Sequence, residues 1–406
     1  MSKRIAFVTY NYWPPQFGGE LIISVERFQG LVERGFEVLA FVSGAKGFSR
    51  HQVDNGVTVF RSPLVGSSRL ARLLRRVVYL FWVAWQLIRT DFEIYYQGDT
   101  AGIDRMTSAL SVRILTSIAH WKKARTVIVH SLADTEHKAF DSHGWAGFWR
   151  RFMFAGFDYI VTVSPGLYEG LKPVFPERAR LIVNGVRDDL FTPLLDHIRR
   201  EFRQRHGVSD DDVVFAFLGT VGYRKGFDLL AQAFLNLVGS HPNWYLWVIG
   251  PYLPEHSQNI DKSKAQTLRR LLEPVASQVK YWGRVDEREQ LNRIISACDV
   301  FVFPSRREGM GLAPVEAMAA GLPVVISRIP NITDLASVEA ETGYYVPVGD
   351  VSALQGAMER LANDADLRQV MGRKAVERVR AHFGWQAHLD QWQELYFGAF
   401  VRLEDE

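Results

Sequence analysis

The sequence predicts an α/β protein made of two doubly wound domains, each with a parallel sheet, and three observations predict it. Apolar, largely β-branched runs alternate with stretches of helical pattern along both halves of the chain. Buried runs separated by helices are typical of parallel sheets that helices cover on both faces. The 406 residues exceed the size at which one core usually stops growing. A content of 47% hydrophobic and 23% charged residues is that of a soluble globular protein.

Each half supplies its own strands and helices. Strands are expected in the first half at Ile5–Tyr10, Val38–Val42, Ile94–Tyr96, Thr126–Val129 and Tyr159–Val163, with helices such as Glu20–Arg34 and Ala109–Lys122 between them. Strands are expected in the second half at Val213–Leu218, Trp244–Ile249, Val279–Trp282, Val300–Phe303 and Pro323–Ile326, alternating with helices Asp228–Val238, Arg288–Ala297 and Ala313–Ala320. Residues 192–212 read as the connection because they contain Pro193 and a polar run. The domain boundary is therefore expected near residue 190.

Charge is distributed unevenly between the halves. Residues 1–185 carry 23 Lys and Arg against 15 Asp and Glu, a net +8, whereas residues 186–406 carry 25 against 30, a net −5. A basic first half is expected to meet something anionic. The single cysteine, Cys298, excludes an internal disulfide and fits a reducing, cytoplasmic compartment. The apolar run Ile5–Tyr10 is too short for a signal peptide, and Val77–Ile88 is too short to cross a bilayer.

Two glutamates separated by seven residues follow the strand expected at Val300–Phe303. Glu308 precedes a Gly-Met-Gly turn, and Glu316 falls in the first turns of a helix that should open near Pro314. A helix opening presents unpaired N–H groups, and carboxylates accept hydrogen bonds from sugar hydroxyls. The pattern predicts a binding site for a ligand with phosphates and hydroxyls. The alternative is that Glu316 only interacts favourably with the positive end of the helix dipole. The residues that follow Glu308 are Gly309, Met310, Gly311 and Leu312, and the two glycines among them let a ligand approach the backbone closely.

Two other strand exits carry glycines. Gly18 and Gly19 follow the first strand and permit close contact with a phosphate, but they do not form a GxGxxG motif, and a structural turn is the alternative. The exit of the strand Val213–Leu218 carries Arg224 and Lys225 in a glycine-rich loop. Arginine can fork onto phosphate oxygens and lysine can act as a point charge, so both would neutralise a leaving diphosphate. A solvated basic turn is the alternative.

A histidine and an aspartate run are weaker candidates. His130 ends the strand expected at Thr126–Val129, where a side chain can face a ligand or the core. The run Asp210–Asp212 precedes a strand, which is the wrong end for a ligand site, and we interpret it as a linker turn. The histidines form no HxxxH or HxxH pair, so no metal site is expected.

A basic, aromatic segment lies in the first half. Arg69, Arg72 and Arg76 recur at helical spacing beside an aromatic-rich run, and the run Trp145–Phe154 is of the same type. This pattern fits a helix in an anionic membrane interface. A buried helix with a solvated arginine face is the alternative.

Together these motifs resemble the retaining glycosyltransferases of the GT-B family 4 over nearly the whole chain. The motifs that carry the resemblance are Gly18-Gly19, Val161–Ser164, Val183–Val186, Phe191–Pro193, Gly219 with Lys225-Gly226, Gly283–Val285, Pro304-Ser305, Glu308–Val324, Thr342-Gly343 and Val346–Asp350. The resemblance implies two facing Rossmann-like domains with a central cleft. Residues 1–190 would bind the acceptor and residues 191–384 the nucleotide sugar, while residues 385–406 would form a helix that crosses back to the first domain.

The resemblance also implies roles for single residues. Arg224 and Lys225 would hold the diphosphate, and Glu316 would hold the ribose. Glu308, with the backbone of residues 309–312, would hold the sugar and phosphate. Gly18-Gly19 would approach the donor from the first domain, and His130 would contact the transferred sugar. Many members of the family have an arginine where this chain has Thr220, which leaves the cationic role to Arg224 and Lys225.

The expected reaction is transfer of a sugar from a UDP- or GDP-sugar to an acceptor hydroxyl with retention at the anomeric carbon. No cofactor and no metal are expected, and no nucleic-acid partner. The basic first half and its Arg/Trp helix suggest a sugar or lipid-linked acceptor of envelope polysaccharide synthesis, at the inner face of the plasma membrane. A nucleotide-sugar epimerase, a phosphorylase and a catalytically silent sugar- or membrane-binding scaffold are the alternatives. Epimerases lack the paired glutamates with the Arg-Lys loop, and a phosphorylase would need a cofactor-lysine site that is not found.

Overall fold

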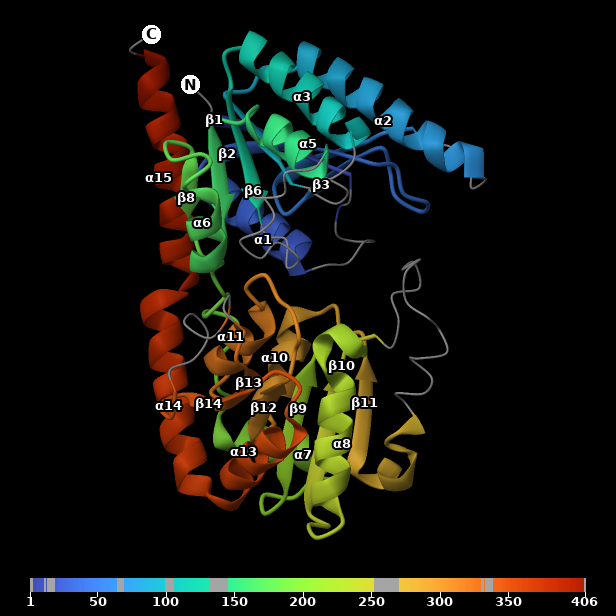
Figure 1. Cartoon of the computed structure of the whole chain (residues 1–406), viewed down its shortest axis with the longest axis vertical. Helices are drawn as coiled ribbons and strands as arrows, with labels where there is room; N and C mark the ends of the chain where they lie inside the picture. Colours follow the sequence, from blue (N-terminus) through green and yellow to red (C-terminus); the bar gives the residue numbers. More distant parts are fainter. Residues whose placement is uncertain are drawn as a thin grey trace. The chain divides into compact units, whose positions relative to one another are not determined.

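The computed structural model describes residues 3–10, 12, 19–63, 69–98, 106–130, 145–251, 270–329, 332 and 339–404. The chain forms two compact units, the first of Met1–Asn184 with Gln386–Glu406 and the second of Gly185–Trp385 (Figure 1). The first unit therefore ends at Asn184, before the boundary expected near residue 190. The last helix, α15 (Trp385–Glu404), lies almost wholly in the first unit.

The first unit is built on an eight-stranded sheet with the order β3-β4-β2-β1-β5-β6-β7-β8. Its strands are β1 (Lys3–Thr9), β2 (Phe36–Val42), β3 (His51–Asp54), β4 (Val57–Arg61), β5 (Ile94–Gln97), β6 (Arg125–His130), β7 (Tyr159–Thr162) and β8 (Ala179–Leu181). Its helices are α1 (Gly19–Glu33), α2 (Arg69–Arg89), α3 (Met106–Trp121), α5 (Trp145–Phe154), α6 (Pro165–Leu171) and α15. All neighbouring strands pair in parallel except β3 and β4, which form an antiparallel hairpin.

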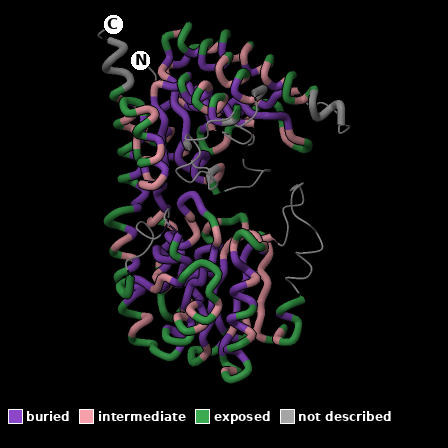
Figure 2. The backbone as a smooth tube through the Cα atoms, viewed as in Figure 1, coloured by how far each residue is buried: buried purple, intermediate pink, exposed green. Residues whose placement is uncertain are grey.

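Helices cover both faces of this sheet. Successive side chains of a strand point to opposite faces, so one strand packs against helices on both sides. Ala6 and Val8 of β1 join the core formed with α2, α3 and α5. Phe7, between them, lies against Phe28 of α1, with ring centroids 4.5 Å apart. Most residues of the strands β1, β2, β5 and β7 are buried, and Figure 2 draws buried residues in purple. This is the arrangement that the buried, β-branched runs predict.

The second unit is built on a six-stranded, wholly parallel sheet with the order β11-β10-β9-β12-β13-β14. Its strands are β9 (Val213–Leu218), β10 (Trp244–Ile249), β11 (Val279–Gly283), β12 (Val300–Phe303), β13 (Val324–Ser327) and β14 (Gly343–Val346). Its helices are α7 (Asp196–Arg205), η1 (Tyr223–Lys225), α8 (Phe227–Val238), η2 (Glu273–Gln278), α10 (Arg288–Ser296), α11 (Leu312–Ala319), α13 (Val351–Asn363) and α14 (Ala365–His382).

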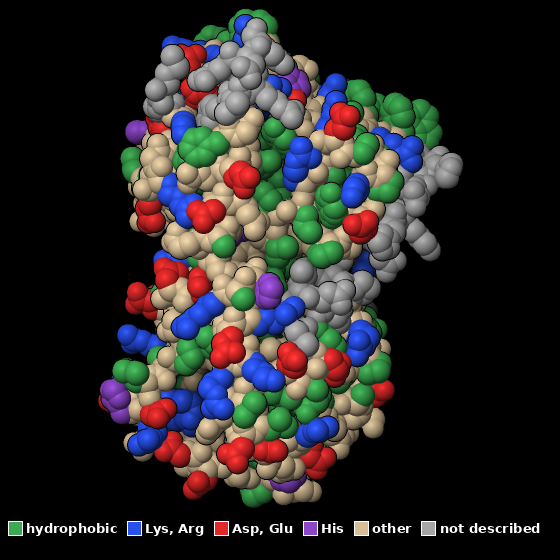
Figure 3. All heavy atoms as spheres, turned by 90° about the vertical axis from the view of Figure 1, so that its left-hand side faces the viewer, with side chains coloured by type: hydrophobic (Ala, Val, Ile, Leu, Met, Phe, Trp, Pro, Cys, Tyr) green, Lys and Arg blue, Asp and Glu red, His purple; other side chains and the backbone are tan. Residues whose placement is uncertain are grey.

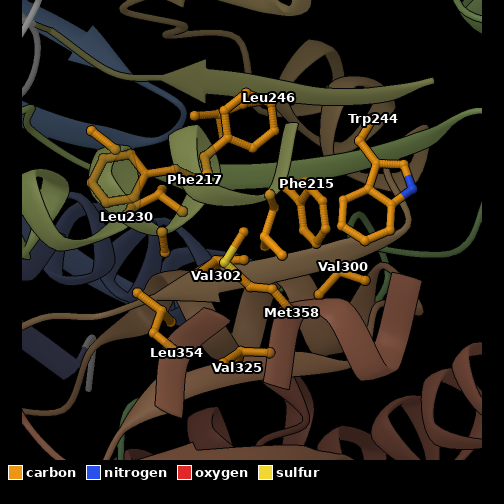
Figure 4. Close-up of a cluster of buried hydrophobic side chains, with 14 of the residues drawn as sticks. Phe215, Phe217, Leu230, Trp244, Leu246, Val300, Val302, Val325, Leu354 and Met358 are labelled. Atoms are coloured by element: carbon orange, nitrogen blue, oxygen red, sulfur yellow. The ribbon is translucent and has the colours of Figure 1, made fainter. Parts of the chain in front are cut away.

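One face of this sheet packs against α8 and α13. Figure 4 shows Phe215 and Phe217 of β9 with Leu230 of α8 and with Leu354 and Met358 of α13, all fully or nearly fully buried. Apolar burial on this scale is the main favourable contribution to the stability of the unit. The segment 192–212, expected to be the connection, contains helix α7 and belongs to the second unit. The buried Arg203 fixes α7 to the sheet through an ion pair of 2.9 Å with Asp299.

The order of the strands locates the site region of the second unit. Strands β10 and β11 follow β9 on one side, and β12, β13 and β14 run outward on the other side, so the winding reverses between β9 and β12. Doubly wound sheets bind ligands beyond the carboxyl ends of the strands at such a reversal. The loops that leave β9 and β12 are those that carry Arg224, Lys225 and Glu308.

Candidate functional site

The two loops that leave β9 and β12 are joined to each other by the backbone. The amide of Arg306 donates to the carbonyl of Arg224 at 2.9 Å, and the Ser305 hydroxyl donates to the same carbonyl at 3.1 Å. Gly226, with φ +68°, lies so close to Pro304 that a Cβ there would collide with the Pro304 carbonyl. Only glycine adopts this conformation at so close an approach without strain. The cationic turn η1 is therefore held against the loop that carries Glu308.

A buried carboxylate lies at the centre of this contact. Oε1 of Glu308 accepts hydrogen bonds from Nζ of Lys225 at 2.6 Å, from the Ser305 hydroxyl at 2.7 Å and from the Arg224 guanidinium at 3.3 Å. The Glu308 side chain is 7% exposed and that of Lys225 is 16% exposed, whereas Arg224 is half exposed. Ionised groups this far from water are stable only when they are paired. Two cations and one anion thus share the carboxyl ends of β9 and β12, leaving an excess of positive charge.

Burial disfavours the charged form of Lys225. Burial lowers the pKa of its ammonium below the ordinary value, because desolvation disfavours the charged form more than the Glu308 carboxylate favours it. Arg224 lowers this pKa further, and the Nζ atom also lies 4.9 Å from the centre of the Phe303 ring. An additional anion at this point would relieve the repulsion between the two cations.

A second ion pair supports the η1 turn from outside. The Arg306 guanidinium binds both carboxylate oxygens of Asp228 at 2.7 and 2.8 Å, and it donates to the Tyr223 carbonyl at 2.6 Å. It also stacks on the Tyr223 ring, 3.7 Å from the centroid. Asp228 lies in the first turn of α8, next to the turn that ends at Gly226. Arg306 therefore clamps the segment that positions Arg224 and Lys225.

Helix α11 begins two residues before the expected opening at Pro314. Gly311 precedes it with φ +71° and ψ 80°, a left-handed conformation that favours glycine, and Leu312 is the first helical residue. Pro314 then lies in the first turn, where its missing N–H costs no hydrogen bond. Met310 is buried. The turn of residues 309–311 thus leads from Glu308 directly to a helix N-terminus with unpaired N–H groups and a positive partial charge.

Glu316 is held by a partner that the sequence did not reveal. Its Oε1 accepts a hydrogen bond of 2.7 Å from Arg288 of α10, and both side chains are largely buried. The Arg288 guanidinium lies 4.7 Å from the centre of the Phe191 ring. This pair fixes the position of the carboxylate.

The structure brings together Arg224, Lys225 and Glu308, and it places the turn of residues 309–312 directly after Glu308. The other predicted site residues, Gly18, Gly19 and His130, belong to the first unit. Gly19 is the first residue of α1, and Gly18 lies outside the described residues. His130 is the last residue of β6, and its side chain lies outside the described part of the chain.

No sequence pattern predicted a role for Ser305, Arg306 or Arg288. Ser305 belongs to the Pro-Ser motif and lies three residues before Glu308, which is a signal that could have been used. Arg306 and Arg288 act through contacts with segments far away in the sequence, so no local pattern points to them.

Comparison with protein families agrees with this geometry. Residues 198–378 match the family described as glycosyl transferases group 1, and residues 26–186 match the glycosyl transferase 4-like domain. The second unit belongs to the group 1 glycosyl transferases. The two matches fall in the second and the first unit, respectively.

Similar proteins carry names of this family. An uncharacterized glycosyltransferase of Methanocaldococcus jannaschii is 24% identical over 406 aligned positions, which cover 94% of this chain and 95% of that protein. The capsular polysaccharide biosynthesis glycosyltransferase CapM of Staphylococcus aureus is 29% identical over 52% of each chain. A D-inositol 3-phosphate glycosyltransferase of Corynebacterium diphtheriae is 30% identical over 54% of this chain and 51% of that protein. The chain spans about half the length of these last two relatives.

Solved structures show the fold of this glycosyl transferase to be GT-B. Sucrose-phosphate synthase of Thermosynechococcus elongatus superposes with a TM-score of 0.81 at 20% identity, over 98% of this chain and all of that one. The HepE protein of Anabaena, in complex with UDP-glucose, gives a TM-score of 0.76 at 15% identity, over 97% and 99%. The two parallel-sheet units fit this fold.

Proposed function

We propose that the chain transfers a sugar from a nucleoside-diphosphate sugar to an acceptor hydroxyl, with retention at the anomeric carbon. The observation that carries the proposal is the cluster of Lys225, Arg224 and Glu308 beside the opening of α11. Group 1 membership supports the reaction class, and the HepE structures contain UDP, glucose and UDP-glucose. A nucleoside diphosphate offers the anion that this cluster would accept.

The cluster suits a diphosphate for electrostatic reasons. Lys225 and Arg224 repel each other, and they share one carboxylate oxygen as their anion. A bound diphosphate would be a second anionic partner for the two cations, beside Glu308, and would remove the excess of positive charge. The same cations, with the N–H groups of the α11 N-terminus, would stabilise the negative charge that develops on the departing diphosphate. Such preorganised stabilisation commonly gives the largest part of a rate enhancement.

The remaining roles follow from the chemistry of each group. Glu316, fixed by Arg288, would accept hydrogen bonds from the ribose hydroxyls. Glu308, with the turn of residues 309–312, would hold the sugar. From the first unit, Gly18-Gly19 would approach the donor, and His130 would contact the transferred sugar.

The step itself breaks the bond between the anomeric carbon and the diphosphate oxygen and forms a bond between that carbon and the acceptor oxygen. The acceptor hydroxyl loses its proton to the departing diphosphate oxygen on the same face of the sugar, which gives retention. No side chain needs to form a covalent intermediate in this scheme. Arg224 and Lys225 would supply the positive charge on the diphosphate, so we propose that the reaction needs no divalent metal.

For the acceptor we propose a lipid-linked intermediate of an envelope polysaccharide, with transfer at the inner face of the plasma membrane. The name of the CapM relative refers to capsular polysaccharide, and the first half of the chain is basic. An anionic membrane surface would attract this half.

A donor screen tests the function. UDP- and GDP-sugars are compared for thermal stabilisation, then for transfer, with the anomeric configuration of the product read by NMR and with EDTA present or absent. One donor is expected to stabilise the protein and to give a product of retained configuration in both conditions. Near-normal transfer by Lys225→Ala or Glu308→Ala would contradict the site, and an inverted product would contradict the mechanism.

A further inference from the structure

Three helices of the first unit lie side by side and expose apolar side chains. Helix α2 packs against α3, and α3 packs against α5, on one face of the sheet (Figure 1). One side of α2 is buried through Tyr79, Val83 and Leu87. The opposite side is also apolar, although it is exposed, and its residues follow one another at intervals of three and four. These residues are Leu74, Val77, Phe81, Trp85 and Ile88.

The exposed stripe continues onto the neighbouring helices. Leu110, Ile114 and Trp121 of α3 share one helical face, and α5 adds Trp145 and Phe148. Phe81, Trp121 and Trp145 are the most exposed, at 71%, 73% and 79%. A monomeric soluble protein rarely leaves so many large apolar side chains together in water. We call these ten residues the three-helix face.

Charge on the three helices is of one sign. Together they hold eight arginines and no aspartate or glutamate. Arg76, Arg89 and Arg151 are exposed, and the Arg89 guanidinium lies 5.3 Å from the centre of the Trp85 ring. Of the acids that follow α2 and α5, Asp91 pairs with Lys122 and Asp158 lies 3.3 Å from His120. The face of the molecule in Figure 3 differs, because acidic and basic side chains are interspersed on it.

We propose that the three-helix face docks on an anionic lipid bilayer, with its aromatic and aliphatic side chains in the headgroup region and its arginines on lipid phosphates. An acidic protein would need no exposed tryptophans on three helices, and a second copy of the face would bring like charges together. Tryptophan is enriched at membrane–water interfaces, and arginine binds phosphate bidentately. Among the described residues no helix is both long and apolar enough to span a bilayer, so this contact would be made from one side.

The inference deepens the proposed function and rests on its membrane-bound acceptor. The three-helix face would hold the first unit at the surface where such an acceptor lies. Binding to lipid and binding of the donor use different residues, so each can fail without the other.

Co-sedimentation with vesicles tests the docking. Phosphatidylcholine vesicles are compared with equimolar phosphatidylcholine–phosphatidylglycerol vesicles at low and high salt. The wild-type protein is expected to bind the anionic vesicles at low salt and to be released by salt. Arg76→Gln with Arg89→Gln should weaken binding by on the order of 30-fold, and Phe81→Ser with Trp85→Ser by at least as much. These side chains are exposed, so Tm and circular dichroism should not change.

Two controls make the test specific. Leu195→Ser with Val370→Ser removes exposed apolar side chains of the second unit and should leave vesicle binding unchanged. Lys225→Ala should also bind vesicles normally while losing donor binding, which separates this inference from the proposed function. Absence of binding to anionic vesicles, equal binding by the Phe81/Trp85 variant, or a wild-type dimer that this variant converts to a monomer would overturn the proposal.

Discussion

The Lys225 ammonium lies 2.6 Å from Oε1 of Glu308, so a residue that leaves β9 is paired with one that leaves β12. Lys225 and Glu308 are far apart in the sequence. They meet because β9 and β12 are neighbours in the sheet, at the point where the order of the strands reverses. The pair therefore depends on the fold of the second unit, and it forms part of the proposed donor site. Its charge balance also governs how the site should respond to pH and to substitution.

The affinity for a nucleoside diphosphate should fall as the pH rises into the alkaline range. The fall should begin at a lower pH than it would with a lysine of ordinary pKa. Burial lowers the pKa of Lys225, while the Glu308 carboxylate raises it. As the pH rises through this lowered pKa, the ammonium is neutralised and its attraction for the anion is lost. In Glu308→Gln the raising influence disappears, so the loss should occur at a still lower pH. Calorimetric titration of UDP and GDP across pH measures both curves, and identical curves would contradict this role of Glu308.

The Asp228–Arg306 pair should position the cationic turn without binding the donor itself. In Asp228→Asn, Arg306 loses its ionic partner, and the turn that carries Lys225 becomes less well held. The affinity for nucleoside diphosphate should fall by about tenfold, the equivalent of 1.4 kcal/mol, and Asp228→Glu should restore part of it. The control is Arg328→Gln, which breaks an exposed pair with Glu339 of the same unit. If Asp228→Asn lowered Tm without changing the affinity, the pair would be only structural.

Glu316 should account for recognition of the ribose. A charged hydrogen bond contributes about 1.5–3 kcal/mol, so the wild-type protein should bind the ribonucleotide about 10- to 100-fold more tightly than its 2′-deoxy or 3′-deoxy counterpart. Glu316→Gln should reduce this preference more than it reduces affinity for the deoxy ligand. Equal discrimination by the two proteins would show that another group reads the ribose.

Gly226 and Gly222 flank the cationic turn and should differ sharply in their tolerance of alanine. A Cβ on Gly226 would collide with the Pro304 carbonyl, and φ there is +68°. Gly222 has extended backbone and open space around the same position. Gly226→Ala should destabilise the second unit by about 3 kcal/mol and lower its Tm by roughly 10 °C. Gly222→Ala should leave Tm within about 1 °C, and a similar loss in both variants would contradict this account of the loop.

Much of the fold follows from the sequence because buried parallel strands have long apolar runs. Strands β9 and β10 have the bounds expected for them, and the two-unit organisation follows from length and alternation. The hairpin of β3 and β4 was missed, although Asn55-Gly56 is a strong turn signal and both residues have positive φ. Its alternating burial at a sheet edge gives no apolar run. The three-residue strand β8 is too short to leave any pattern.

The candidate site was predictable only in part. Paired acids, glycines and adjacent cations are local patterns, so Glu308, Glu316, Arg224 and Lys225 could be selected from the sequence. Their partners could not be predicted in this way, because Arg288 of α10 and Glu316 of α11 are brought together only in the folded unit. The same holds for the three-helix face, where α3 gives no charge signal of its own and matters only through its neighbours.

The most direct test of the central claim is calorimetric titration of UDP and GDP into the wild-type protein, Lys225→Ala and the control Lys374→Ala, an exposed lysine of α14. If the Lys225–Glu308 cluster holds the donor diphosphate, the wild-type protein and Lys374→Ala bind one of the nucleotides equally well. Lys225→Ala then binds it at least about tenfold more weakly while keeping its fold. Equal affinity in all three proteins would contradict the claim.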